Sequence, residues 1–303
     1  MRRVGQTNKV VAKEKSRRLK AVHEEKARER ELFYQLFPRI IADQLILGTE
    51  LVPETFQSVS VFASDIVGFT VLSSKSTPMQ VVELLNEFFT DVDQILDKHD
   101  CVKVETIGDA YIVASGLPVV NEPQHSDHLC TMALDILQLC RTFCIPQCNY
   151  ETVMLRVGIN TGPVAAGVVG IRRPKYCMFG HTLNIAVHME SSGAAMRIQI
   201  ADTTARHLYK HHKCFHFRRR GKTEVVAKGL IDTFWLLKKK GHPYEIDLEE
   251  ADRLHKAATY CRYDVKKNEN EFDALSTFSA ASYSVLDGAL SAGQSTITAE
   301  VHA

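Results

Sequence analysis

VKVETIGDAY, residues 102–111, has the pattern of a β-hairpin. Apolar and polar residues alternate as they do in a strand, and Gly108-Asp109 is a typical turn pair. Strand alternation places Glu105 on the face opposite Val104. Glu105 is therefore a charge on a short apolar strand, and Asp109 is a carboxylate at the turn. A purely structural hairpin would need neither of them.

A second carboxylate stands in a similar setting at Asp65, within VFASDIVGFT (residues 61–70). A short apolar strand ends at Asp65, and Gly68 lets the following backbone turn tightly with amide N–H groups that can bind phosphates. Alone, a turn aspartate such as Asp109 is more often a backbone acceptor than a metal ligand. Two carboxylates at the ends of neighbouring strands beside such a loop instead suit a pair of hard divalent cations that bind a nucleoside triphosphate.

The segments around these carboxylates predict an α+β sandwich. Thr77 is a helix N-cap with Gln80 closing a capping box, and apolar residues then recur at helical spacing as far as Leu96. A second helix is predicted at about 125–143 and a strand at 153–159. The order strand, helix, hairpin, helix, strand is that of a ferredoxin-like βαββαβ fold.

The remaining segments give weaker patterns. A helix is predicted at about 182–191, a possible helix at 247–260, and disorder from about residue 268, where small polar residues dominate. Residues 1–30 are mostly charged. A heptad frame can be drawn from Leu19 to Ile40, although two of its core positions are charged. Closing strands are predicted at 214–217, 224–227 and 233–237.

Composition limits the classes of function. The chain has 303 residues, 45% of them hydrophobic, and a formal net charge of +1, so we expect no nucleic-acid partner. No apolar run reaches the length of a membrane span, and we expect no membrane insertion by this chain itself. Eight cysteines scattered through apparent core elements indicate reduced thiols, which favours a cytoplasmic location.

Four segments closely resemble the class III nucleotidyl cyclases, and among them the guanylyl cyclases. They are SDIVGFT (64–70), KVETIGDAY (103–111), LRVGINTGPVAAGVVG (155–170) and KYCMFGHTLNIAVHMESSG (175–193). The resemblance runs in order from about Leu32 to Leu237. It implies a helical or coiled-coil dimerisation linker at 1–48 and a guanylyl cyclase catalytic domain at 56–240. Beyond Lys240 the residue patterns weaken, and we expect a largely disordered extension at 241–303. If the chain is part of a longer receptor cyclase, it would lie at the cytoplasmic face of the membrane.

The implied reaction converts GTP to 3′,5′-cyclic GMP and pyrophosphate. By resemblance, Asp65, Asp109 and the carbonyl of Ile66 hold two magnesium or manganese ions per site. Arg156 matches a position that binds the β and γ phosphates, and Lys228 is the candidate for a further phosphate-binding lysine in a shortened loop. The amides that would bind the same phosphates are those of Val67, Gly68, Phe69 and Thr70.

Choice of base would rest on Glu105 and Cys177. Guanine presents N1–H and N2–H₂ donors, and an ionised Glu105 only accepts. Adenine would leave that carboxylate unpaired, at a cost of about 1 to 3 kcal/mol. Cys177 can lie near O6, although a lone cysteine is ordinarily a buried apolar thiol. The resembling adenylyl cyclases have Lys and Asp at these two positions, so GTP is the expected substrate.

Asn184 and His188 are four residues apart and therefore share one face of the predicted helix. The family has Asn and Arg there, to orient the ribose and to stabilise charge on the α-phosphate. His188 replaces the permanently charged Arg, and His181 stands where the guanylyl cyclases usually have Asp, so we expect reduced turnover. The alternative is a catalytically weakened domain that binds nucleotide or dimerises with an active partner. A binding module without cyclase chemistry would explain neither Asp65 nor Asp109.

The family's sites form between two subunits, which implies a homodimer or a heterodimer with another cyclase domain. Asp65, Asp109 and Arg156 would then face residues of the partner subunit. Those residues would be Glu105, Cys177, Asn184 and His188. A separate group of histidines between His207 and His216 has no paired-ligand spacing, and the sequence does not favour a metal site there.

Overall fold

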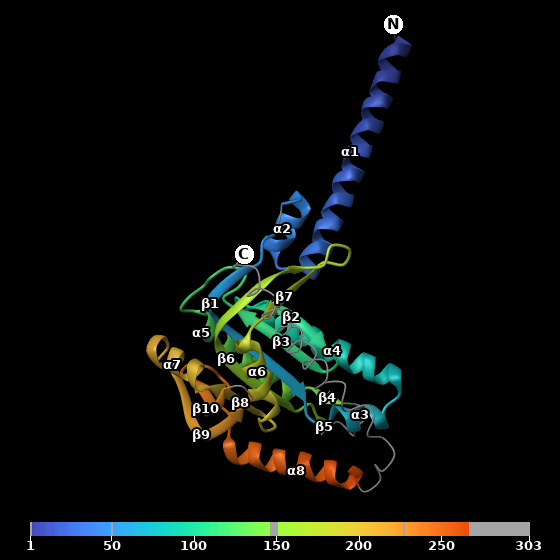
Figure 1. Cartoon of the computed structure of the whole chain (residues 1–303). Coiled ribbons are helices and arrows are strands. Elements are labelled where there is room, and N and C mark those ends of the chain that lie inside the picture. The colour runs from blue at the N-terminus through green and yellow to red at the C-terminus, as the bar shows by residue number, and fades with distance from the viewer. Residues whose placement is uncertain (1, 50, 146–150, 227, 267–303) are drawn as a thin grey trace, which may run out of the picture. The chain divides into compact units, whose positions relative to one another are not determined.

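The computed structural model describes residues 2–49, 51–145, 151–226 and 228–266 (Figure 1). The chain divides into two compact units, residues 1–255 and 256–303. The expected disordered tail from about residue 268 lies outside the described residues. No helix among the described residues combines the length and the apolar character that a bilayer crossing requires.

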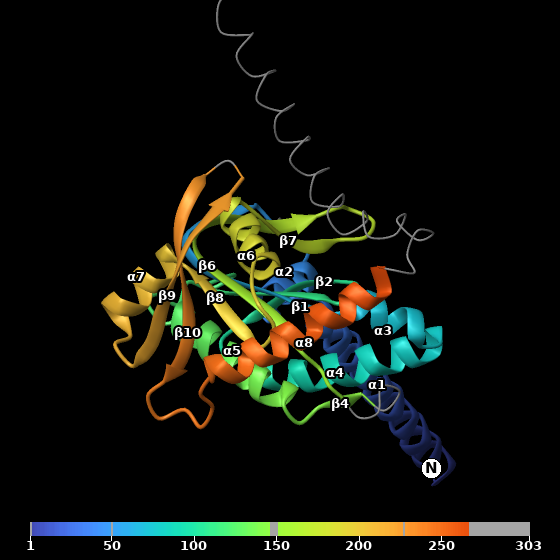
Figure 2. The ribbon, with the colours of Figure 1, turned by 90° about the horizontal axis from the view of Figure 1, so that it is seen from below.

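One mixed sheet of eight strands forms the centre of the first unit, as far as the structure describes the chain. Its order is β2-β3-β1-β6-β8-β10-β9, and β7 pairs with β6; the labelled strands β6, β8, β10 and β9 can be followed in Figure 2. A two-stranded sheet of β4 and β5 lies apart from it. The strands are β1 (Glu54–Ile66), β2 (Val102–Ile107), β3 (Ala110–Ser115), β4 (Cys144–Ile145), β5 (Glu151–Thr152), β6 (Leu155–Val169), β7 (Lys175–Phe179), β8 (Arg197–Ala201), β9 (Phe215–Val225) and β10 (Gly229–Lys239).

The predicted ferredoxin-like core is confirmed by the antiparallel order β6-β1-β3-β2, in which the first strand lies inside the sheet. The helices complete the βαββαβ order, because α4 lies between β1 and β2 in the chain and α5 between β3 and β6. The helices are α1 (Arg2–Leu36), α2 (Arg39–Leu47), α3 (Phe69–Lys75), α4 (Pro78–Leu96), α5 (His125–Cys140), α6 (His181–Ser191), α7 (Asp202–His211) and α8 (Leu248–Lys266).

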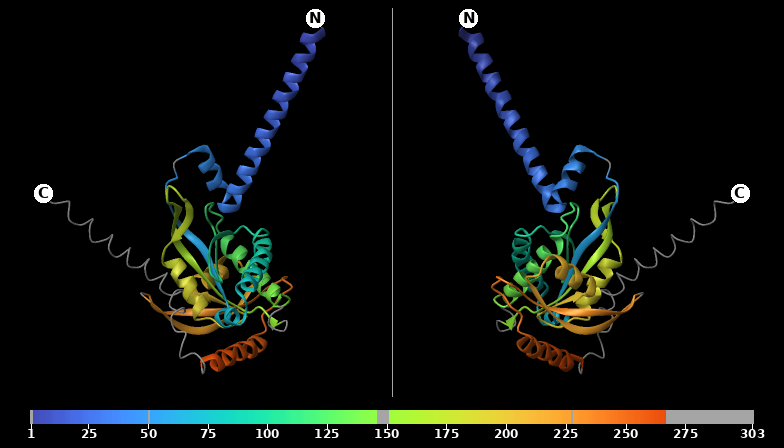
Figure 3. Two further views of the ribbon diagram at one scale, coloured as in Figure 1. Left: turned by 90° about the vertical axis from the view of Figure 1, so that its right-hand side faces the viewer. Right: turned by 90° about the vertical axis from the view of Figure 1, so that its left-hand side faces the viewer.

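The sheet carries different helices on its two faces (Figure 3). Phe62 and Ile66 of β1 pack in the main core with Phe88 of α4 and Leu129 of α5. The intervening residue Asp65 belongs to the other face, since successive strand side chains alternate. That other face carries α6, so the predicted site residues of β1 and β6 lie on the α6 side.

Helix α6 approaches β6 closely at Gly158. A Cβ added there would lie 2.1 Å from the backbone nitrogen of Glu190 and 2.2 Å from the carbonyl oxygen of Ala186. Both are backbone atoms and cannot rotate away. Glycine at position 158 therefore sets the depth of α6 on the sheet.

Gly158→Ala is expected to destabilise the fold by about 1 to 3 kcal/mol or more, because the added methyl overpacks the contact with α6. Denaturant unfolding monitored by circular dichroism measures the effect. Gly167→Ala, on the same strand, is the matched control. Its added Cβ meets Pro53 at 3.0 Å and should cost less. Equal costs for the two variants would contradict this account of α6 packing.

The two N-terminal helices end close to a proline and at a glycine. Helix α1 ends at Leu36 before Pro38, and α2 ends at Leu47 before Gly48, which adopts the left-handed conformation. Several large apolar side chains on these helices are exposed, including Leu32 at 60%, Leu36 at 75% and Leu47 at 76%. These helices therefore present apolar side chains that the described chain does not cover.

The structure confirms one local prediction and adds elements that the sequence did not predict. The capping box of Thr77 and Gln80 is present as predicted. The stretch from Gly162 to Gly170 was not assigned a strand, yet residues up to Val169 belong to β6, where small residues let Pro53 pack closely. Strand β8 and helix α7 were missed. Among the cysteines whose side chains the structure describes, all are free thiols, as expected.

Candidate active site

The side chains of Asp65 and Asp109 meet at one end of β1. Asp109 follows Gly108, whose φ of 62° lies in the left-handed region that favours glycine and lets the hairpin turn there. Burial raises the pKa of Asp109 to about 8, and a hydrogen bond and charge repulsion from Asp65 add to the rise. Backbone N–H groups of Asp109 and Ile66 act in the opposite direction. The two carboxyl groups are therefore in contact.

This donor set fits a hard divalent cation. Two carboxylates in contact repel each other when both are ionised, and a cation between them offsets that repulsion. Oxygen ligands of this kind suit Mg²⁺ or Mn²⁺ rather than softer metals. The backbone of Ile66 lies beside them, so its carbonyl remains the proposed further ligand.

Arg156 lies directly across from Asp65 in the β1–β6 pairing. Its Nη2 donates to Asp65 Oδ2 at 2.5 Å and its Nε to Glu190 Oε1 at 2.8 Å. The Arg156 side chain is only 18% exposed, and the two neighbouring carboxylates raise its pKa although burial opposes them. Arg156 is thus held by two carboxylates, and its other N–H donors are those that a phosphate could use.

The sequence did not indicate Glu190 as part of this site. It is 7% exposed and lies near the end of α6, beneath the Arg156 guanidinium. A single acidic residue near a helix end ordinarily faces solvent, so the sequence gives almost no signal for this role. Only the close packing of α6 on β6 brings it to Arg156.

The proposed phosphate loop offers fewer free backbone amides than expected. Gly68 has a φ of 78°, and Phe69 and Thr70 are the first two residues of α3, where helix N–H groups have no intrahelical partner. The Val67 amide, however, donates to the carbonyl of Met154 at 2.8 Å. The expectation for Val67 is therefore corrected: its amide is used within the fold, which leaves those of Gly68, Phe69 and Thr70.

Glu105 and Cys177 form a second group of predicted site residues, in which Lys175 lies between them. Lys175 Nζ lies 2.9 Å from Glu105 Oε2, and the Cys177 thiol is 3.6 Å from the Lys175 carbonyl oxygen. Partial burial raises the pKa of Cys177, with Lys175 lowering it and Glu105 raising it. The two residues predicted to read the base thus lie together. Lys175 was missed, although it is two residues from Cys177 and so shares its face of β7.

The remaining predicted residues lie on α6 and on the β9–β10 turn. Asn184 and His181 are exposed and His188 is half-buried on α6, while Lys228 is exposed in the turn. Within the described parts of the chain, no hydrogen bond or ion pair joins Asn184, His188 or Lys228 to the carboxylate pair. The structure thus brings some of the predicted residues together in two groups, while the others lie on α6 and in the β9–β10 turn.

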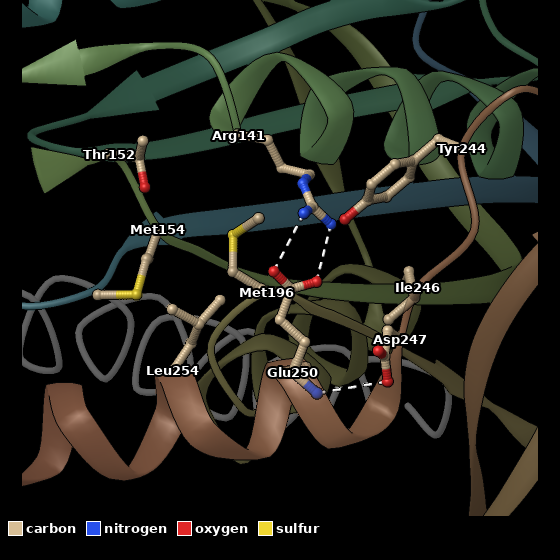
Figure 4. A pocket seen from close by; sticks show the side chains of 10 residues that line it. Arg141, Thr152, Met154, Met196, Tyr244, Ile246, Asp247, Glu250 and Leu254 are labelled. Atoms are coloured by element: carbon tan, nitrogen blue, oxygen red, sulfur yellow. Dashed lines mark hydrogen bonds and ion pairs between the residues drawn. The ribbon is translucent and has the colours of Figure 1, made fainter.

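A cavity of about 140 Å³ lies elsewhere in the first unit (Figure 4). Arg141 closes one side by a bidentate ion pair with Glu250, at 2.9 and 3.0 Å. Met154 and Met196 supply much of its apolar lining. None of the predicted site residues lines this cavity, so it plays no part in the candidate active site.

Comparison with known proteins gives concordant results. The family described as "Adenylate and Guanylate cyclase catalytic domain" matches residues 51–238. Guanylate cyclase 2G of Mus musculus is 47% identical over 77% of this chain and 21% of its own length. Atrial natriuretic peptide receptor 2 of Rattus norvegicus is 47% identical over 75% of this chain and 22% of its own length. The chain thus spans about a fifth of the length of these relatives.

A solved structure agrees with the fold. The guanylate cyclase domain of RhGC from Catenaria anguillulae, in complex with GTP, superposes with a TM-score of 0.58 at 37% identity. That match covers 62% of this chain and 100% of the other.

Proposed function

Because this chain belongs to the adenylate and guanylate cyclase catalytic domain family, we propose that it converts GTP to 3′,5′-cyclic GMP and pyrophosphate. The observation that carries the proposal is the contact between Asp65 and Asp109 beside Ile66, on a loop that leads into a helix N-terminus. Cyclic GMP formed from GTP with magnesium or manganese is the direct test. If no product forms with either metal, the remaining alternative is a catalytically weakened domain that binds nucleotide or dimerises with an active partner.

Catalysis of this phosphoryl transfer is mostly positioning and charge stabilisation. Two divalent cations held by Asp65, Asp109 and Ile66 would lower the pKa of the ribose 3′-hydroxyl and screen the triphosphate. Arg156, already oriented by Asp65 and Glu190, would direct its remaining N–H donors to the β and γ phosphates. The amides of Gly68, Phe69 and Thr70, with Lys228, would complete the phosphate contacts.

Recognition of guanine would involve three residues. Lys175 holds one oxygen of Glu105, which leaves the other to accept from the N1–H and N2–H₂ donors of guanine. Cys177 would lie at the O6 side. The ion pair is partly exposed, so its main effect is to orient the carboxylate rather than to stabilise the fold.

Reversal of base preference should require a change at Lys175 as well. In Glu105→Lys with Cys177→Asp, the introduced ammonium would lie beside Lys175, and the two like charges would repel. We therefore expect the triple variant with Lys175→Gln to favour ATP over GTP by at least about tenfold in kcat/KM, and the double variant to shift less. Lys175→Gln alone is the control. An unchanged preference for GTP in the triple variant would defeat this assignment.

His188→Arg should raise kcat for cyclic GMP formation about 10- to 100-fold, because arginine remains charged at neutral pH and can stabilise the developing phosphate charge. The side chain at position 188 is half-buried on α6, beside the residues that would hold the ribose. His216→Arg, at an exposed position on β9, is the matched control and should change nothing. Equal activity of His188→Arg and the parent chain would count against the reading of this position.

We further propose that the active site is completed by a second subunit, in a homodimer or a heterodimer with another cyclase domain. Two observations support a shared site. The predicted residues lie in two separate groups, and α1 and α2 expose apolar side chains. In this proposal residues 1–48 form a dimerisation linker, 56–240 the catalytic domain and 241–303 an extension. The free thiols support a cytoplasmic location, at the membrane face if the chain belongs to a receptor.

A further inference from the structure

A group of imidazoles lies beside the middle of β1, away from the carboxylate pair at its end. Glu122, His125 and His207 each direct one ligand atom into a common space, and these atoms all lie within 4.8 Å of one another. Glu122 belongs to the loop after β3, His125 begins α5 and His207 lies on α7. The three residues, called the His–Glu cluster below, join segments more than eighty residues apart.

A serine hydroxyl holds one ring nitrogen of each histidine, and the other ring nitrogen, Nε2, is the candidate metal ligand. His125 Nδ1 lies 2.8 Å from Ser60 Oγ, and His207 Nδ1 lies 2.7 Å from Ser126 Oγ. When each Nδ1–H donates to its serine, each Nε2 carries the lone pair. Metal-binding histidines commonly have a second hydrogen bond of this kind, which fixes the tautomer and the ring orientation.

His207 Nε2 is the observation that points to a ligand. It is buried and has no hydrogen-bond partner within the described chain, and the nearest carboxylate oxygen, Glu122 Oε1, is 4.0 Å away. Buried polar atoms of this kind ordinarily have a partner. His125 Nε2 lies 3.1 Å from the Ser58 hydroxyl and can exchange that contact for a metal bond.

We propose that Glu122, His125 and His207 form a second metal site, for Zn²⁺ or an ion of similar chemistry, distinct from the carboxylate pair. Two imidazole nitrogens and one carboxylate are ligands that zinc accepts, with water in the fourth position. Small side-chain rotations must bring the three atoms together, since ligands of one ion lie closer than 4.8 Å. Ser60 precedes Asp65 by five residues on β1, which is about 17 Å along an extended strand.

Zinc at this site would stabilise the fold. It would connect the loop after β3 to α5 and α7, and a ligand that binds only the folded chain raises its unfolding temperature. The sequence does not indicate this site, because Glu122 and His125 lie more than eighty residues before His207 in the chain.

Cobalt(II) titration of the full chain in excess magnesium tests the proposal. The excess magnesium would occupy the carboxylate pair of Asp65 and Asp109, and tetrahedral cobalt gives visible absorption bands. We expect one cobalt per chain, displaced by zinc, and zinc should raise the unfolding temperature. Glu122→Gln, an exposed position that should not disturb folding, should weaken binding at least about 100-fold, and Ser126→Ala about 10- to 100-fold. His216→Ala and Asp65→Asn should bind as the parent chain does.

Three results would overturn the proposal. They are the absence of a cobalt band, equal affinity in Glu122→Gln and the parent chain, and a cobalt–thiolate charge-transfer band, which would assign the metal to cysteines instead. Because the readout is metal binding rather than turnover, it is independent of whether the chain is an active cyclase. His207→Ala gives a second check, with circular dichroism to establish that the variant is folded.

Discussion

Asp109→Asn is expected to abolish cyclic GMP formation and, at the same time, to make the metal-free protein more stable. Loss of a metal-binding carboxylate should reduce kcat about 1,000-fold, since the charge that the site must stabilise would lose its counter-ion. The stability effect has the opposite sign because the same carboxylate is buried against Asp65, and its pKa is raised to about 8.

The pH dependence of this effect follows from the direction of the shift. An unfolded aspartate has a pKa of about 3.9. Since the folded-state pKa is higher, the stability contributed by protonated Asp109 is complete below about pH 4 and is lost as pH rises towards 8. Asparagine carries no such charge. In the absence of divalent cations at pH 8, Asp109→Asn should therefore gain about 1 to 3 kcal/mol, or roughly 2 to 10 °C in unfolding temperature.

Thermal unfolding at pH 5 and pH 8, with and without magnesium, measures this effect. Magnesium should stabilise the parent chain more than the variant. Asp97→Asn, which changes an exposed carboxylate at the end of α4, is the matched control and should affect neither property. A variant that is inactive and also less stable at pH 8 would indicate that Asp109 has a structural role instead.

Two variants that are each inactive should recover activity when they are mixed. Asp65→Ala removes a metal ligand and Asn184→Ala removes the proposed ribose contact. If one subunit supplies the metals and the other supplies Asn184, a mixed dimer contains one site with both residues intact and one with neither. Random association of equal amounts then yields about a quarter of the parent activity, from two preparations that have almost none.

The experiment separates a shared site from a site within one chain. Refolding or co-expression allows the subunits to exchange, and cyclic GMP formation is the readout. Asp65→Ala mixed with Asp109→Ala is the control, because both residues would belong to the same half of the site and no activity should return. Recovery in the control, or no recovery in the test pair, would contradict the proposed division of residues.

The sequence alone determined the fold class of this protein and its resemblance to the cyclase family. Strand alternation, the Gly108 turn and the Thr77 capping box are local features, because they depend on backbone geometry within a few residues. The carboxylate pair could also be predicted, since Asp65 and Asp109 end adjacent segments of a recognisable order. These signals are short-range or follow from topology.

The tertiary structure decided what depends on contacts between distant segments. Glu190 reaches Arg156 only because Gly158 admits α6 so close to β6, and Lys175 reaches Glu105 only because β7 lies beside β2. Burial and repulsion between carboxylates raise the pKa of Asp109, and no pattern of residue types reveals that. Desolvation and side-chain pairing are properties of three-dimensional packing. Only the fold therefore revealed Glu190 and Lys175 beside residues that the sequence had predicted.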